Sequence, residues 1–491
     1  MSSVNRRKFL TVSLASVLGG TSFSNIPLAQ AADKQTSNSS FDLIILGAGC
    51  AGLVAALQAS EKGAKVLLLE KANRPDGNSL YAIGTICSWG TRPHKEFNMP
   101  DTAEEFYKAM MYVSSGRADP RLTQTYTNNI SEDVNWLIDK TGIKFLRRAK
   151  KGPWPIEYRS INVDGEGITG GGQLIKKLLS AVRKTNAQIL FEHKAVQLLT
   201  NDKMEVIGVK ALTPDGLKDF YTRAGVLVAT GGFSANPEMT DMYIGGWAAK
   251  LAIRGSRSTT GENISLAKPL FAKFVNMDQF HAGPIVSKTH VNPVSVINSG
   301  HGIITDIRGN RFIDEFNTYV IKSKATAQLT PENKAVVIVD STCPALKRII
   351  GKYDKLNTKY GKADTVKEAA EMLGLDGNKI QRAADEYNEA LRANKLKELP
   401  LPYSHKKPIP LEKAPFYVIP FEGGMTATFG GPLINDKAEV QNLEGKSIPG
   451  LYAAGNAAGG LFYNNYIAGA QLGAALVFGR IAAKEMLDKL K

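Results

Sequence analysis

The sequence has 491 residues, of which 43% are hydrophobic and 22% charged, so disordered, collagen-like and coiled-coil classes are excluded. Beyond the N-terminal segment, no apolar run is long enough for a multi-spanning membrane protein. Three cysteines cannot supply a disulfide framework, and no Cys-x-x-Cys-His motif for covalent haem occurs. The formal charge of +15 indicates either a solvated basic surface or a docking face for an acidic redox partner or an anionic substrate.

The first 31 residues have the pattern of an export signal. A twin-arginine motif spans Asn5 to Leu10, a weakly apolar run follows from Phe9 to Gly20, and Ala29-Gln30-Ala31 supplies a small-x-small cleavage site. The alternative is a disordered basic N-terminus, but the three regions occur in the order that export requires. We therefore expect residues 1–31 to be a twin-arginine signal peptide and the mature protein to be periplasmic.

A dinucleotide-binding unit is predicted directly after this segment. An apolar strand at 41–46 leads into a glycine turn at 47–52, a helix at 53–62, and a second strand at 65–69 that ends in Glu70. In this fingerprint Gly47 allows the tight turn, Gly49 lets the backbone approach a pyrophosphate, and Gly52 lets the helix pack on the strand. The helix N-terminus faces the phosphate charge, and Glu70 accepts ribose hydroxyls.

Three later segments favour FAD over NAD as the dinucleotide. A turn follows the second strand at 76–79, an apolar strand at 225–230 leads into a Gly-Gly turn, and the stretch 450–460 is again rich in glycine. A last helix is predicted from about Gly469 to the C-terminus. An NAD domain closes its site locally, whereas an FAD domain returns the late part of the chain to the flavin.

At this point the chain resembles the flavoproteins of the soluble fumarate reductase and 3-ketosteroid dehydrogenase family. The resemblance covers nearly all of residues 41–491 and rests on the segments 42–49 (DLIILGAG), 77–79 (GNS), 229–233 (ATGGF), 309–315 (GNRFIDE), 448–455 (IPGLYAAG) and 478–482 (FGRIA). It implies an α/β fold, with a Rossmann-like FAD-binding domain at 41–235 and 426–491 and an inserted α+β capping domain at 236–425. It also implies that the cap closes the substrate against the flavin.

The fingerprint and the resemblance together give the candidate cofactor-binding residues. They are Gly47, Ala48, Gly49, Ala51, Gly52, Glu70, Lys71, Asn78, Ser79, Thr230, Gly231, Gly455, Asn456, Gln471 and Leu472. The N-terminus of the last helix is expected to direct its amides at the flavin N1–O2 edge. No histidine occurs at 78–84, where relatives with a covalently linked flavin place theirs, so we expect noncovalent FAD and name no metal ligands.

The substrate-binding motifs of the fumarate reductases are altered in this sequence. His281 is kept, but the segment 294–299 lacks the family's glutamate and arginine, and 427–431 lacks its histidine. Tyr319 stands where the resemblance places the proton-donating arginine, and Tyr466 replaces a second arginine. Without two guanidinium groups a dicarboxylate loses its natural clamp, so fumarate itself is a poor substrate for this site.

The two tyrosines become the candidate acid/base groups by this resemblance. A phenol can donate a proton or a hydrogen bond to a carbonyl oxygen, and the steroid dehydrogenases of the family use tyrosines at their flavin. The alternative for Tyr319 and Tyr466 is core packing with a satisfied hydroxyl. His281 is either a third catalytic candidate or a structural histidine.

The predicted function is a periplasmic FAD-dependent oxidoreductase that reduces the C=C bond of an α,β-unsaturated carbonyl or carboxylate compound. Electrons are expected from a separate redox partner such as a c-type cytochrome, because the chain carries no haem motif and no second dinucleotide fingerprint. Two alternatives stay open within flavoproteins: a ketosteroid-type dehydrogenase that introduces the double bond, and an electron-transfer subunit of a complex. A dinucleotide-binding sensor without turnover is the third.

Overall fold

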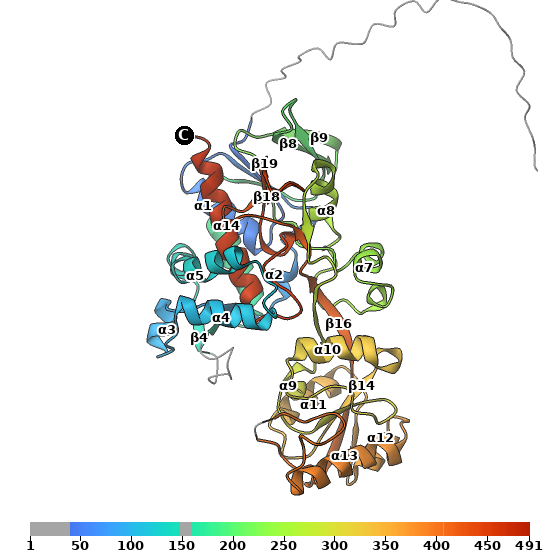
Figure 1. Cartoon of the computed structure of the whole chain (residues 1–491). Coiled ribbons are helices and arrows are strands. Elements are labelled where there is room, and N and C mark those ends of the chain that lie inside the picture. The colour runs from blue at the N-terminus through green and yellow to red at the C-terminus, as the bar shows by residue number, and fades with distance from the viewer. Residues whose placement is uncertain (1–39, 148–158, 406) are drawn as a thin grey trace, which may run out of the picture. The chain divides into compact units, whose positions relative to one another are not determined.

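The computed structural model describes residues 40–147, 159–405 and 407–491 (Figure 1). The predicted signal peptide, residues 1–31, lies outside the described residues. Among the described helices, none combines the length and the apolar character that a membrane crossing requires.

The fold is a mixed α/β arrangement with a mostly parallel sheet at its centre. Six strands form this sheet in the order β18-β19-β10-β1-β2-β6, and every neighbouring pair is parallel except the antiparallel edge pair β18–β19. The strands are β1 (Leu43–Leu46), β2 (Val66–Leu69), β6 (Gln188–Leu190), β10 (Val226–Val228), β18 (Glu439–Gln441) and β19 (Ser447–Ala453). This is the Rossmann-like sheet that the sequence predicted.

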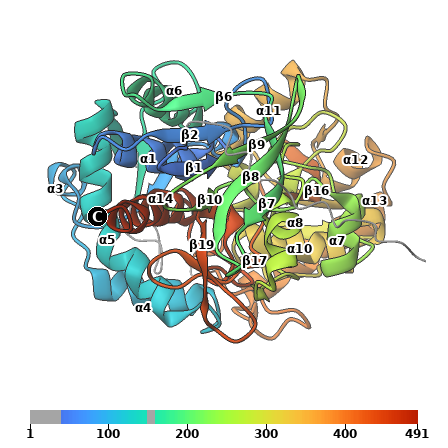
Figure 2. The ribbon, with the colours of Figure 1, turned by 90° about the horizontal axis from the view of Figure 1, so that it is seen from above.

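The predicted strand, glycine turn, helix and strand occur in the predicted order. Both strands are shorter than predicted, whereas the helix begins at Cys50, inside the predicted glycine turn, and ends at Ser60. The helix α1 (Cys50–Ser60) follows β1 and is buried on nearly every side, which explains its run of alanine, leucine and valine. It packs between α6 (Gly170–Val182) and the C-terminal helix α14 (Ala470–Asp488). Figure 2 shows α1 and α14 next to each other, beside the strands β1, β2 and β10 of the parallel sheet.

A second, five-stranded sheet lies in the middle of the sequence. Its order is β12-β16-β14-β13, with β15 also paired to β16, and all its pairs are antiparallel. The strands are β12 (Phe280–Ile285), β13 (Ile303–Asp306), β14 (Ala335–Val339), β15 (Gly361–Ala363) and β16 (Phe416–Thr428). Because β16 continues past residue 426, it crosses one expected domain boundary, and the bounds of the two domains remain a proposal.

Smaller sheets and further helices surround the two large sheets. The remaining strands are β3 (Thr85–Cys87), β4 (Phe145–Arg147), β5 (Ser160–Val163), β7 (Lys194–Thr200), β8 (Val206–Thr213), β9 (Gly216–Tyr221), β11 (Phe274–Val275) and β17 (Gly431–Pro432). The remaining helices are α2 (Asn78–Tyr81), α3 (Arg92–Glu96), α4 (Ala103–Val113), α5 (Pro120–Thr141), α7 (Pro237–Tyr243), α8 (Glu262–Ala267), α9 (Val294–Ile297), α10 (Tyr319–Leu329), α11 (Leu346–Lys355), α12 (Val366–Glu371) and α13 (Gly377–Arg392). The predicted turn at 76–79 therefore leads directly into a one-turn helix.

The largest hydrophobic core lies around the parallel sheet, α1 and α14. It includes all four residues of β1 and β2, none of which is more than 2% exposed. Strands buried on both faces read as continuous apolar runs, as these do. Two further cores pack against the faces of the five-stranded sheet. The side chains at the strand ends are thus held on a rigid scaffold.

Candidate functional site

A cavity of about 500 Å³ opens at the carboxyl ends of the parallel strands. Leu46, Leu69 and Ala229, which end or follow β1, β2 and β10, all line it. The chain leaves β1 between β2 and β10, and such a switch point is where open α/β sheets bind dinucleotides. The cavity wall also includes residues of β12, α9, α10 and β16, so both large sheets contribute to it.

Most predicted cofactor-binding residues line this cavity. Those on its wall are Gly47, Gly49, Ala51, Glu70, Lys71, Asn78, Ser79, Thr230, Gly231, Gly455, Asn456, Gln471 and Leu472. Ala48 and Gly52 do not line it. Ala48 donates its backbone N–H to Glu70 Oε2 at 2.8 Å, and Gly52 faces the turn before α1.

The three glycines at the start of α1 are each required for a different reason. Gly47 has a φ of +105°, and a Cβ there would lie 2.6 Å from the Ala229 carbonyl oxygen. A Cβ at Gly52 would lie 1.9 Å from the Gly47 carbonyl oxygen, so this residue allows close helix–strand packing. A Cβ at Gly49 would meet no protein atom nearer than Ser79 Oγ at 3.9 Å. The space beside Gly49 therefore belongs to the cavity.

The acidic end of β2 is buried and held by backbone amides. Glu70 is 6% exposed and accepts hydrogen bonds from Ala48 N at 2.8 Å and Ala72 N at 2.9 Å. Burial raises the pKa of this carboxyl above its usual value, and the two amides oppose that shift. A carboxylate has about four lone-pair sites, so two remain for hydroxyl donors in the cavity.

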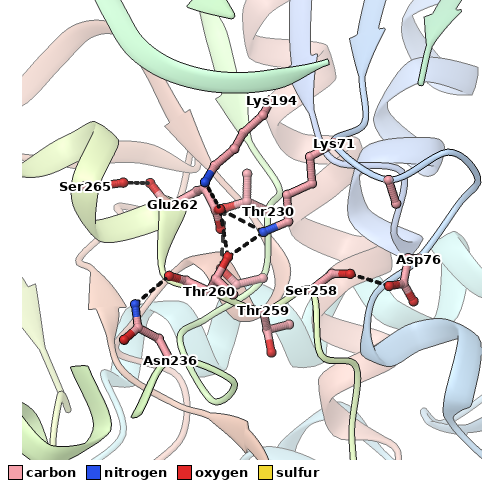
Figure 3. Close-up of polar contacts among 12 residues, drawn as sticks. Lys71, Asp76, Lys194, Thr230, Asn236, Ser258, Thr259, Thr260, Glu262 and Ser265 are labelled. Carbon is pink, nitrogen blue, oxygen red and sulfur yellow. Dashed lines mark hydrogen bonds and ion pairs between the residues drawn. The ribbon is translucent and has the colours of Figure 1, made fainter. Parts of the chain in front are cut away.

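A network of charged and polar residues closes the wall beside Glu70 (Figure 3). Lys71 Nζ donates to Thr260 Oγ1 at 2.5 Å and to Glu262 Oε1 at 2.7 Å, and Lys194 Nζ lies 3.5 Å from the same carboxylate oxygen. Figure 3 shows the two lysines approaching Glu262 from the ends of β2 and β7. Both cations thus share one carboxylate, and Lys71 is already engaged within the protein.

The far part of the cavity is built by the end of the chain. A Cβ at Gly455 would lie 3.3 Å from the Ala51 methyl and 3.5 Å from that of Ala475, so small residues of α1 and α14 meet here. The helix α14 begins after Gly469, whose φ is +95°, and Gln471 and Leu472 of its first turn line the cavity. Two helix N-termini, those of α1 and α14, therefore face the same space.

These features fit FAD on structural grounds. The cavity is lined by glycine and alanine, with one helix N-terminus for phosphate charge, a buried carboxylate for ribose, and a second helix N-terminus farther along. The Asn78 amide is occupied within the protein, because it donates to the Thr426 carbonyl and accepts from Ser256 N. The Asn78 side chain therefore shapes the wall.

The three predicted catalytic residues come together on this wall. His281 Nε2 lies 2.9 Å from the Tyr319 hydroxyl, which lies 2.9 Å from the Tyr466 hydroxyl. His281 Nδ1 lies 3.2 Å from Gln471 Oε1, and Gln471 Nε2 donates to Asn456 Oδ1 at 3.1 Å. With the amides assigned in this way, the hydrogen bonds all run in one direction. Tyr466 donates to Tyr319, Tyr319 to His281, His281 to Gln471, and Gln471 to Asn456.

Local structure places each of these side chains. The β12–β16 pairing has an irregularity between His281 and Ala282, and such bulges redirect side chains. Tyr319 is the first residue of α10, after the N-cap Thr318. The Asn465 side-chain oxygen accepts from Thr318 Oγ1 at 3.2 Å and from Tyr466 N at 2.9 Å. The residues that precede the two tyrosines therefore hold each other.

The electrostatics of the site favour a neutral imidazole beside a cation. Burial lowers the pKa of His281 well below its usual 6.5, and the nearby Arg254 charge lowers it further. Arg254 lines the cavity and interacts electrostatically with both Tyr319 and Tyr466. Neutral His281 can then accept the Tyr319 proton at Nε2 because its Nδ1 proton is directed at Gln471.

Several wall residues were missed by the sequence reasoning. They are Arg254, Glu262, Asn292, Ser295, Asn298 and Thr426. Asn298 and Ser295 belong to the altered 294–299 segment, so its position in the family pattern was a usable signal. Arg254 has no motif of its own and comes to the site through the fold.

The fold and this site define a dinucleotide-binding protein of the flavin type. The chain belongs to the FAD binding domain family, whose profile matches residues 42–472. FAD is therefore the cofactor.

Curated relatives with similar sequences are mostly reductases. The chain is 28% identical over 467 residues to an NADH:fumarate oxidoreductase of Klebsiella pneumoniae, covering 94% of this chain and 49% of that protein. It therefore spans about half the length of that relative. It is 27% identical to a fumarate reductase (cytochrome) of Shewanella frigidimarina, covering 93% and 78%. It is 26% identical to an acrylate reductase flavoprotein subunit of Shewanella woodyi, covering 91% of both.

Solved structures show the same architecture. The open conformation of a flavocytochrome c3 fumarate reductase superposes with a TM-score of 0.77 at 25% identity, covering 92% of this chain and 79% of that one. A 3-ketosteroid delta1-dehydrogenase of Sterolibacterium denitrificans gives a TM-score of 0.78 at 17% identity, covering 92% and 100%. The second likeness concerns the fold alone.

Proposed function

We propose that the protein is an FAD-dependent oxidoreductase that reduces the C=C bond of an α,β-unsaturated carbonyl or carboxylate compound, and that fumarate is not its substrate. The observation that carries this proposal is the hydrogen-bonded chain of Tyr466, Tyr319 and His281 on the wall of the FAD cavity. Relatives whose names specify reduction of fumarate and acrylate support the reaction class. Tyrosines in place of two arginines oppose a dicarboxylate.

Reduction of one C=C bond adds two electrons and two protons. Bound FAD supplies hydride chemistry. Tyr319 or Tyr466 supplies the proton that goes to the carbon next to the carbonyl. When Tyr319 is the donor, Tyr466 replaces its proton along the hydrogen bond between the two hydroxyls. The adjacent Arg254 guanidinium stabilises the phenolate that proton donation leaves. Gln471 keeps the imidazole of His281 in the tautomer that accepts from Tyr319.

Export and electron supply complete the proposal. The twin-arginine pattern at residues 5–10 and the cleavage site at 29–31 support a periplasmic location. Electrons would come one at a time from a separate donor such as a c-type cytochrome, and the FAD would be held without a covalent bond. Residues 1–31 carry three basic side chains and no acidic one, so their removal lowers the formal charge from +15 to +12, which still suits an acidic partner of this kind.

The test uses the full chain, purified with its flavin under anaerobic conditions. Reduced methyl viologen serves as the electron donor, and a panel of unsaturated acids, aryl acrylates and enones serves as acceptors. Wild-type protein is expected to turn over members of this panel, and Tyr319→Phe is expected to lose about 10²–10⁴-fold in kcat. Tyr221→Phe, which changes a tyrosine that is 41% exposed on β9, is the matched control.

Two outcomes would contradict the proposal. Unchanged turnover by Tyr319→Phe with FAD still bound would remove the catalytic role of the phenol. Oxidation of a saturated ketone by an artificial acceptor, without measurable reduction of any C=C compound, would favour the ketosteroid-type direction.

A further inference from the structure

Arg254 is held on the cavity wall by backbone contacts on both sides. Its own N–H donates to the Met425 carbonyl at 2.7 Å, and Ile253 forms a bridge with the same strand, β16. Two residues later, Ser256 N donates to the Asn78 side chain at 2.7 Å. The segment is therefore fixed to β16 on one side and to α2 on the other.

A pair of glycines makes room for the Arg254 side chain. Gly283 of β12 and Gly424 of β16 face each other in the register of the two strands. A Cβ at Gly283 would lie 1.8 Å from Arg254 Nη1 and 2.3 Å from Cζ, and a Cβ at Gly424 would lie 3.0 Å from Cδ. The guanidinium thus packs directly against Gly283, and any side chain at position 283 would occupy the same space.

The charge of this guanidinium has no anionic partner within the described residues. Arg254 Nη1 donates to Thr426 Oγ1 at 2.5 Å, and no carboxylate of residues 40–147, 159–405 or 407–491 forms an ion pair with it. The two lysines on the described cavity wall, Lys71 and Lys194, both form ion pairs with Glu262. Arg254 is partly buried. A partly buried charge without a counterion is costly, and an anionic ligand lowers that cost.

The neutral residues of the cavity wall limit the number of anionic groups that a ligand can carry. Asn292, Ser295 and Asn298 line the cavity, and each is neutral. Arg254 is therefore the one cation of the described wall that is free to pair with a ligand. Arg254 can therefore form an ion pair with one carboxylate of a substrate, and the rest of the substrate contacts neutral side chains.

We propose that Arg254 binds the single carboxylate of an α,β-unsaturated monocarboxylate and so determines the substrate class. A guanidinium matches the planar geometry of a carboxylate through paired N–H donors. Neutralising a carboxylate that is conjugated to the double bond makes the distal carbon more electrophilic. The same guanidinium lines one cavity with Tyr319 and Tyr466 and interacts electrostatically with both, so the bound acid would lie in the cavity that holds the proton donors. This inference rests on the proposed function.

The test compares Arg254→Gln, Gly283→Ala and the control Arg257→Gln with wild type. Gly283→Ala keeps the charge but displaces the guanidinium, which is the movable end of a flexible side chain. Arg257 lies on the same segment and is exposed. The acids acrylate and cinnamate are assayed beside their methyl esters, with fumarate as the dicarboxylate. Separately, oxidised holoprotein is titrated with propanoate and 3-phenylpropanoate, and binding is followed by the flavin absorption spectrum.

The expected result is a loss of acid binding that spares the esters. Arg254→Gln should weaken the binding of propanoate and 3-phenylpropanoate by about tenfold to a hundredfold. It should raise the KM of the unsaturated acids by a similar factor. Gly283→Ala should act in the same direction, Arg257→Gln should match wild type, and wild type should prefer monocarboxylates over fumarate.

Other results separate the two proposals. An unchanged acid-to-ester ratio in Arg254→Gln, or a wild-type preference for fumarate, would overturn the role of Arg254 and leave C=C reduction standing. If no C=C compound is turned over, the proposed function fails, and the absorption titrations with propanoate and 3-phenylpropanoate still decide whether Arg254 binds a carboxylate.

Discussion

At the scale of single residues, the site depends on the order of donors in one hydrogen-bonded chain. Tyr319 is in the middle of that chain, between the imidazole of His281 and the hydroxyl of Tyr466, at 2.9 Å from each. Tyr466 also packs against His281, with ring centroids 4.5 Å apart. Removal of the central hydroxyl interrupts the chain, whereas removal of the outer one shortens it.

We therefore expect Tyr466→Phe to lower kcat less than Tyr319→Phe, and the double variant to be no slower than Tyr319→Phe alone. Residues that act as one unit are non-additive in this way. Steady-state rates with reduced viologen for the four members of the double-mutant cycle measure the coupling. Additive losses would mean that the two phenols act independently.

The protonation state of His281 gives a second prediction. Its pKa is lowered well below 6.5 by burial and by Arg254, so the imidazole stays neutral as the pH falls from about 8 to about 6. Over that range kcat/KM should show no acid limb centred at the ordinary histidine value. A limb near 6.5 that disappears in His281→Asn would contradict the assigned state of this residue.

At the scale of elements, two glycines at the start of α1, Gly49 and Gly52, serve different purposes. Gly52 allows the helix to approach the turn, and Gly49 keeps a space open beside the cavity. Gly49 has φ of −77° and ψ of −173°, an extended conformation that alanine adopts without strain. The two positions can therefore be tested by the same substitution.

Gly52→Ala should destabilise the protein by about 1–3 kcal/mol or more, because a Cβ there overlaps a backbone carbonyl oxygen. Gly49→Ala should leave the unfolding of the FAD-free protein nearly unchanged and weaken FAD binding. Thermal unfolding of the FAD-free proteins and fluorescence titration with FAD measure the two effects. Equal loss of stability in both variants would show that Gly49 serves folding.

How much of this site can be predicted from sequence depends on whether local spacing or tertiary pairing makes it. The turn at 47–52 follows from local spacing, because glycines, strand and helix are adjacent in the chain. The positions of Tyr319 and Tyr466 came from comparison with a family pattern. The space for the Arg254 side chain requires Gly283 and Gly424 to be opposite each other, and that register exists only once β12 and β16 have paired.

At the scale of the whole molecule, the positive net charge governs the encounter with an electron donor. The formal charge is +15 for the full chain and +12 without residues 1–31, and opposite charge on a partner accelerates association until salt screens it. Methyl viologen is itself a cation, so its encounter is slowed by the same field. The two donors should therefore respond to salt in opposite directions.

Raising the ionic strength from low to physiological values should lower the rate with an acidic c-type cytochrome by about tenfold. The rate with reduced methyl viologen should stay constant or rise. Stopped-flow reduction of the bound flavin by each donor measures both. A cytochrome rate that does not change with salt would mean that net charge does not steer the partner.

The closing helix α14 has a consequence for biosynthesis. Gly47 and Gly49 leave the ribosome long before Gly455, Gln471 and Ala475, which belong to the wall of the same cavity. A nascent chain therefore presents half a binding site, with α1 lacking its α14 neighbour. Stable retention of the cofactor therefore has to wait until α14 has been synthesised.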